Sequence, residues 1–119
     1  MEFNEHKAIY LQIADTLCER ILSKQWVAEE RIPSVRELGT ALGVNPNTIA
    51  RTYDYLQQRE IIYNKRGIGF FVAPGARKEI LTSQKEQFLK EELPLFFKKL
   101  DLLGITMEEI EVYYKNLKP

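Results

Sequence analysis

The sequence offers very little for covalent cross-linking or metal binding. It contains one cysteine, Cys18, and one histidine, His6, among 119 residues. One cysteine cannot form an internal disulfide, and this pair falls short of the ligands that a zinc site needs. Because Cys18 lies in a predicted helix, we expect it to be a small core residue rather than a sensor thiol. The sequence predicts no metal site and no cofactor.

Long apolar runs and catalytic motifs are missing as well. No segment approaches the roughly 18 to 20 apolar residues that span a bilayer, and the N-terminus lacks the basic start and apolar block of a signal peptide. We therefore expect a cytoplasmic protein. No nucleophile stands beside a histidine base, and there is no HExxH motif or glycine-rich phosphate loop. These absences argue against an enzyme.

The chain carries no excess of positive charge. Lysine and arginine number 17, aspartate and glutamate also 17, and the balance holds separately in residues 1–76 and 77–119. A protein that coats nucleic acid without sequence preference is usually basic, so this class is disfavoured. A sequence-specific reader is not excluded, because a few cations can gather on one surface.

Residues 32–58 contain two helix starts separated by a short turn. Ser34 and Glu37 form a capping box, and Gly43 is suited to a left-handed helix end. Asn45 is a good N-cap for a second helix with Pro46 at its first position. The apolar spacing predicts that Val35, Leu38, Ala41 and Leu42 face the core from the first helix, and Ile49, Tyr53 and Leu56 from the second. The second helix leaves Asn47, Thr48, Arg51 and Tyr55 on another face.

Helix, tight turn and helix is the arrangement that places a second helix in the DNA major groove. Asn47 and Thr48 could bond to bases or phosphates, and Arg51 could bind guanine or phosphate. Residues 60–63 and 68–72 are predicted strands, joined by a turn at Asn64-Lys65-Arg66-Gly67. A cationic hairpin beside a helix-turn-helix predicts a winged-helix fold.

These motifs resemble the DNA-binding domain of the GntR family of bacterial transcription regulators. The resemblance is carried by Ile32-Pro33-Ser34-Val35-Arg36-Glu37-Leu38, Gly43-Val44-Asn45, Thr48-Ile49, Leu56 and Gly67-Ile68-Gly69-Phe70-Phe71-Val72. The VNPNT form and the short tail are most similar to the YtrA-like subfamily, whose members carry a small helical dimerisation segment.

The resemblance implies DNA contacts, with two departures. Many members carry base-reading arginines where this chain has Pro46 and Ala50, which leaves the operator sequence open. The family also commonly has glycine near Glu60, so the turn there could be built differently. The predicted DNA-binding residues are Ser34, Arg36, Asn45, Asn47, Thr48, Arg51, Lys65, Arg66 and Gly67.

The predicted first helix, residues 8–24, has Ile9, Ile13, Leu17 and Ile21 at steps of four, with Ala14, Cys18 and Leu22 beside them. After it, Trp26 is expected to anchor the loop before Ile32, with ligand stacking as the minor alternative.

The tail has a wide apolar stripe and no domain of its own to cover it. Leu81, Phe88, Leu95 and Leu102 lie seven apart, Pro94 should bend or break the helix near residues 90–92, and Gly104 should stop it. Thr106 and Glu109 predict a capping box for a last helix. Exposed stripes of this size usually mark interfaces. The predicted dimerisation residues are Leu81, Phe88, Leu95, Phe96, Leu100, Ile110, Tyr113 and Tyr114.

Together these features predict a mainly α fold with a small β-hairpin wing. Residues 1–75 would form a winged helix-turn-helix domain, and residues 76–119 two C-terminal helices for dimerisation. The predicted function is a sequence-specific DNA-binding transcriptional regulator that acts as a homodimeric repressor on a palindromic double-stranded operator. A winged-helix protein–protein interaction module is the alternative, and an unknown small-molecule effector stays open.

Overall fold

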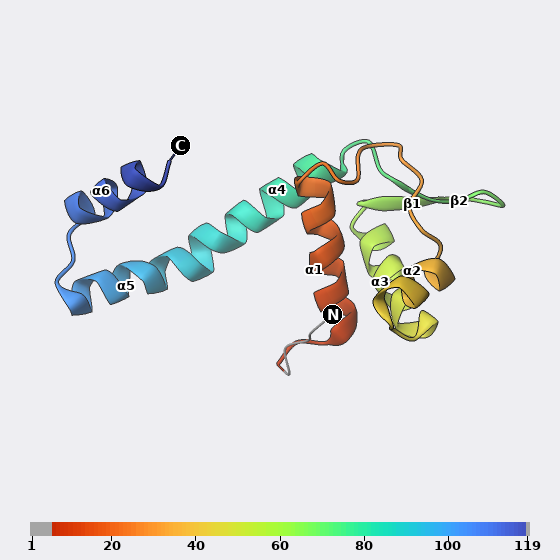
Figure 1. The fold of residues 1–119 in the computed structure, drawn as a ribbon, viewed down its shortest axis with the longest axis horizontal. Helices are drawn as coiled ribbons and strands as arrows, with labels where there is room; N and C mark the ends of the chain where they lie inside the picture. Colours follow the sequence, from red (N-terminus) through yellow and green to blue (C-terminus); the bar gives the residue numbers. More distant parts are fainter. Residues whose placement is uncertain (1–5, 119) are drawn as a thin grey trace. The chain divides into compact units, whose positions relative to one another are not determined.

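The structure is a computed structural model that describes residues 6–118. Residues 1–5, part of the polar leader in which no signal peptide is predicted, lie outside the described residues. The element order is α1 (Ile9–Leu22), α2 (Val35–Leu42), α3 (Pro46–Gln58), β1 (Ile62–Lys65), β2 (Gly69–Val72), α4 (Ala76–Gln87), the π-helical turn η1 (Phe88–Glu92), α5 (Leu93–Leu103) and α6 (Met107–Leu117) (Figure 1). The mainly α class with one antiparallel hairpin is confirmed.

The chain divides into two compact units, one ending at Thr82 and the other beginning at Ser83. The division therefore falls inside α4, a few residues later than the predicted boundary at 75/76. In the first unit α3 packs against both α1 and α2 and also meets β1. Figure 1 shows α1 running beside α3, with the hairpin extending past them.

The core of the first unit follows the predicted apolar faces closely. Ile13, Leu17 and Ile21 of α1 are buried, as are Ile49, Tyr53 and Leu56 of α3. Trp26 joins the same cluster, which confirms its predicted anchoring place. Two expectations were wrong: Ile9 is 46% exposed, because it stands in the first turn of α1, and Ala41 is exposed on α2.

The hairpin lies two residues later than predicted at its first strand. The amide of Ile61 donates to Leu56 O (2.9 Å) and so closes the end of α3 instead of starting a strand. Ile62 pairs with Val72, and Lys65 with Gly69. Asn64 and Lys65 thus belong to β1, because a three-residue loop, Arg66 to Ile68, suffices to reverse the chain.

Glu60 settles the question about the turn before the wing. Its φ is 61°, the left-handed conformation that glycine usually supplies. The turn is therefore the same kind that a glycine would build, with a glutamate carrying the conformational strain.

In the tail, Pro94 perturbs the helix without breaking it. The chain passes through η1 directly into α5, so the missing amide of Pro94 falls in the first turn of a new helical segment. Gly104 (φ 67°) ends α5 as predicted. Thr106 Oγ1 accepts from the amide of Glu109 (3.2 Å), so one of the two bonds of the predicted capping box is present.

Candidate nucleic-acid interface

The turn between α2 and α3 is built by side-chain caps. Ser34 Oγ accepts from the amide of Glu37 (3.1 Å), and Glu37 Oε1 accepts from the amide of Ser34 (3.1 Å). These bonds to Ser34 lower the pKa of the Glu37 carboxyl. Gly43 is left-handed at φ 66°, and Asn45 Oδ1 accepts from the amide of Asn47 (2.8 Å). The predicted helix-turn-helix is therefore present in detail.

Gly39 is a residue of this motif that the sequence analysis missed. A Cβ built on it would lie 2.8 Å from the carbonyl oxygen of Val44 and 3.6 Å from Pro46. Only the absence of a side chain lets α2 approach the start of α3 this closely. The position of Gly39 inside a predicted helix does not indicate this contact, because the contact depends on how the chain folds back after α2.

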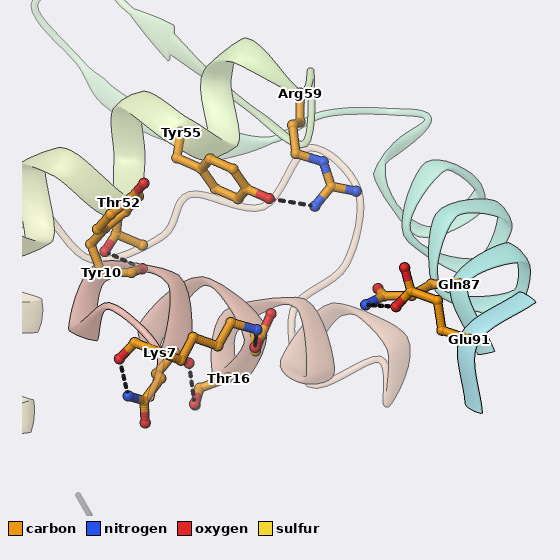
Figure 2. Close-up of polar contacts among 10 residues, drawn as sticks. Lys7, Tyr10, Thr16, Thr52, Tyr55, Arg59, Gln87 and Glu91 are labelled. Atoms are coloured by element: carbon orange, nitrogen blue, oxygen red, sulfur yellow. Dashed lines mark hydrogen bonds and ion pairs between the residues drawn. The ribbon is translucent and has the colours of Figure 1, made fainter. Parts of the chain in front are cut away.

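The buried side of α3 is fixed by two hydroxyl groups as well as by apolar packing. Tyr53 OH donates to Pro33 O (2.6 Å), and burial raises the pKa of this phenol. Thr52 Oγ1, fully buried, lies 2.9 Å from Tyr10 O (Figure 2) and 3.2 Å from Thr48 O. The Tyr10 contact joins α1 to α3 and so fixes the rotation of α3 about its axis.

With that side buried, the polar side of α3 faces outward. Asn47, Thr48 and Arg51 line one shallow hollow together with Ala8, Ile9 and Tyr10 at the start of α1. Asn47 and Arg51 are exposed and Thr48 is half-buried. The structure therefore brings together the three predicted base-reading residues.

The other predicted residues of α2 and α3 hold terminal positions. Ser34 and Asn45 are N-caps, so their side-chain oxygens already accept backbone amides. Arg36 is exposed in the first turn of α2.

The wing has an aromatic base under its cations. Lys65 Nζ lies 4.4 Å from the ring centroid of Phe71 and 5.9 Å from that of Tyr63, and these two rings stack at 5.8 Å. Tyr63 OH donates to Glu29, which raises the pKa of the phenol. Arg66 and Gly67 are exposed in the loop. Lys65 is therefore held against the sheet, and Arg66 is the exposed cation of the loop.

Arg31 is a third cation, beside the wing, that the sequence analysis missed. Its backbone forms an isolated antiparallel β-bridge with Phe71 of the hairpin. Its side-chain Nε lies 3.0 Å from the position that a Cβ on Gly69 would occupy. Gly69 (φ 144°) leaves the space that this guanidinium covers. Arg31 is far from the hairpin in sequence, so only the fold reveals it.

The described residues contain neither a metal-binding cluster nor a membrane-spanning helix. No three histidine, cysteine, aspartate or glutamate side chains among residues 6–118 come together as a metal site. Within the same residues no helix is long and apolar enough to cross a membrane. Cys18 is buried as expected, and burial raises the pKa of its thiol to about 11.

The tail presents most of its predicted interface residues to solvent. Leu81, Phe88, Leu95, Phe96, Tyr113 and Tyr114 are all exposed, and Ile110 is half-buried. Leu100 is the exception at 6% exposure, because it lies on the side of α5 that faces the interior of the second unit. Its prediction as surface for a partner is corrected to a buried packing residue.

Comparison with known proteins decides the family. Residues 9–72 match the family described as bacterial regulatory proteins, gntR family. The chain belongs to the GntR family. It is 40% identical to YhcF of Bacillus subtilis, an uncharacterized HTH-type transcriptional regulator, over 92% of this chain and 88% of that one. It is also 31% identical to the HTH-type transcriptional repressor YtrA of the same organism, over 92% of this chain and 83% of YtrA.

Solved structures agree with this placement of the GntR chain. A putative GntR-family regulator from Bacteroides thetaiotaomicron superposes with a TM-score of 0.76 at 57% identity, over 92% of this chain and 95% of that one. The DNA-binding domain of AraR, in complex with operator ORR3, matches at a TM-score of 0.55 and 27% identity, over 61% of this chain and 86% of that chain. The winged-helix fold and the family of transcriptional regulators are thus shown.

Proposed function

We propose that this GntR-family chain is a homodimeric, sequence-specific DNA-binding protein that represses transcription from a palindromic operator. The observation that carries the proposal is the hollow at the start of α3, where Asn47, Thr48 and Arg51 lie together on the side opposite the core. AraR, a structural relative, is bound to an operator, and YtrA, a sequence relative, is a repressor.

On DNA, α3 would enter the major groove with these three side chains toward the base edges. Arg36, together with the helix-start residues Ser34 and Asn45, would lie at the sugar-phosphate backbone. Lys65, Arg66 and Gly67 would contact phosphates or the minor groove through the wing. With no net charge on the chain, specific binding would depend on these few contacts.

A selection from a random DNA library with the full-length protein tests this reading. We expect the enriched sites to contain two inverted half-sites about one helical turn apart.

Arg51→Ala should cost about 1–3 kcal/mol of specific binding and relax the preference at one base pair. Lys65→Ala should weaken all duplexes alike and lower the salt slope by about one. Lys85→Ala, which removes an exposed tail cation, is the matched control. A folded dimer that enriches no site would favour the protein–protein interaction module.

The dimer would form through the exposed apolar residues of the tail, where Phe96 is 44% and Leu95 68% exposed. Soluble chains rarely leave such stripes uncovered, and a second copy offers the same stripe by two-fold symmetry. Phe96→Arg should raise the dissociation constant of the dimer at least about thirtyfold, as expected for a buried aromatic anchor. Gln84→Arg, at an exposed polar position, is the control, and sedimentation velocity across a dilution series is the measurement. A monomeric wild type, or a Phe96→Arg protein that dimerises equally well, would contradict the proposal.

A further inference from the structure

The guanidinium of Arg51 lies over an aromatic ring of another helix. Its Cζ is 4.0 Å from the ring centroid of Tyr10, well within the range of a cation–π contact. Tyr10 is half-buried in the first turn of α1, whereas Arg51 is exposed on α3. The contact therefore sits at the edge of the first unit, where an arginine would otherwise be mobile.

Tyr10 is itself held by two contacts with α3. Its carbonyl oxygen accepts the bond from buried Thr52 (2.9 Å), and its ring meets the edge of Tyr55 at a centroid distance of 6.1 Å and an angle of 77°. Tyr55 in turn accepts a bond from Arg59 Nη1 (3.3 Å), as Figure 2 shows. Arg51 and Tyr55 of α3 and its C-cap residue Arg59 stand at steps of four along one stripe, and Tyr10 packs against Arg51 and Tyr55.

The cation–π contact leaves the donors of Arg51 available. It uses the charge of the guanidinium and does not engage its N–H groups in hydrogen bonds. Among residues 6–118 none accepts a hydrogen bond from it. A long side chain held in one orientation, with its donors unused, loses less conformational freedom when it binds a planar acceptor pair.

We infer that Tyr10 is a positioning residue for DNA reading. Its ring holds the guanidinium of Arg51, on α3, in the orientation for a bidentate hydrogen bond to a guanine base of the DNA. The inference rests on the proposed function, because it assigns the base contact of that same site. It also adds a residue of α1 to a reading surface that would otherwise belong to α2, α3 and the wing.

A double-mutant cycle on the selected operator tests the inference with the full-length protein. Tyr10→Leu keeps an apolar side chain but removes the ring, and should weaken operator binding roughly two- to fivefold, the value of an exposed cation–π contact. Tyr10→Phe retains the ring and should restore wild-type affinity. In an Arg51→Ala background, Tyr10→Leu should have no further effect, and binding to a scrambled duplex should change in neither background.

An equal loss in both backgrounds would mean that Tyr10 acts through folding and would overturn the inference. Relaxation of the Arg51 Nε–H group by ¹⁵N NMR gives a reading without DNA: we expect an ordered group in wild type and Tyr10→Phe, and a mobile one in Tyr10→Leu. An unchanged order parameter would also overturn it. A wild-type protein that selects no DNA at all would instead overturn the proposed function, and the reading role of Tyr10 with it.

Discussion

The first unit of this protein buries its apolar side chains, whereas the second leaves most of them exposed. In the first, side chains from α1, α2, α3, the hairpin and the start of α4 form one buried cluster that reaches Ile80. In the second, Leu100 is the one buried apolar side chain among residues 83–118, while Leu102 is 78% exposed. Three helices and a hairpin can enclose a core from several directions, whereas a long helix and a short one cannot.

This difference indicates which interactions stabilise each unit. The first unit gains it from its own core and can hold a rigid reading surface on the outside of α3. The second keeps its helices through local interactions, such as the exposed Lys90–Glu86 and Lys115–Glu111 pairs, which contribute little. Burial of its apolar side chains would stabilise the second unit only when a partner covers them, as expected of a segment that associates with another chain.

The largest expected effect separates the two units directly. Leu56→Ala removes a fully buried side chain of the first unit and should cost about 2–5 kcal/mol of unfolding free energy. Leu102→Ala in the second unit should change it by less than about 0.5 kcal/mol in dilute solution. Trp26, the single tryptophan, lies in the first core and reports both in urea titrations. Equal losses would mean that the tail is part of the same core.

A second prediction concerns close packing, which only the first unit requires. Gly39→Ala would push α2 from the turn before α3 and should cost about 1–3 kcal/mol. Gly75→Ala is the matched control, since nothing lies within 4 Å of its added Cβ and its φ is not positive. The urea midpoints of both variants give the measurement. If Gly39→Ala proved as mild as the control, the contact with Val44 O would not be tight in solution.

The smallest effect should be a gain in stability. Glu60→Gly releases the strain of a glutamate at φ 61° and, after the entropy that glycine adds to the unfolded chain, should stabilise the first unit by about 0.5–1 kcal/mol. Glu60→Ala removes the same carboxylate but keeps the strained backbone, so thermal unfolding of the two variants separates these causes. Gly104 has nearly the same φ, 67°, in the tail, and Gly104→Ala should loosen the α5–α6 turn without moving the unfolding of the first unit. A Glu60→Gly protein no more stable than Glu60→Ala would contradict the strain.

Features that depend on neighbours along the chain could be predicted from the amino-acid sequence alone. The caps at Ser34 and Asn45, the left-handed Gly43 and the buried stripe of α3 could be predicted because each follows from residues within one or two helical turns. The family resemblance followed from the same local motifs. The exposed stripe of the tail was visible in the same way, although Leu100 needed the fold to show that it is buried.

Contacts between residues far apart in the sequence became visible in the folded chain alone. Tyr10 lies 42 residues from Thr52, yet the two are bonded, and the ring of Tyr10 meets Arg51 for the same reason. Gly39, Arg31 and the later start of β1 likewise depend on backbone segments that approach through folding. A helical period gives the direction of a side chain relative to its own helix, but the partner that it meets is set by how the core packs the helices together.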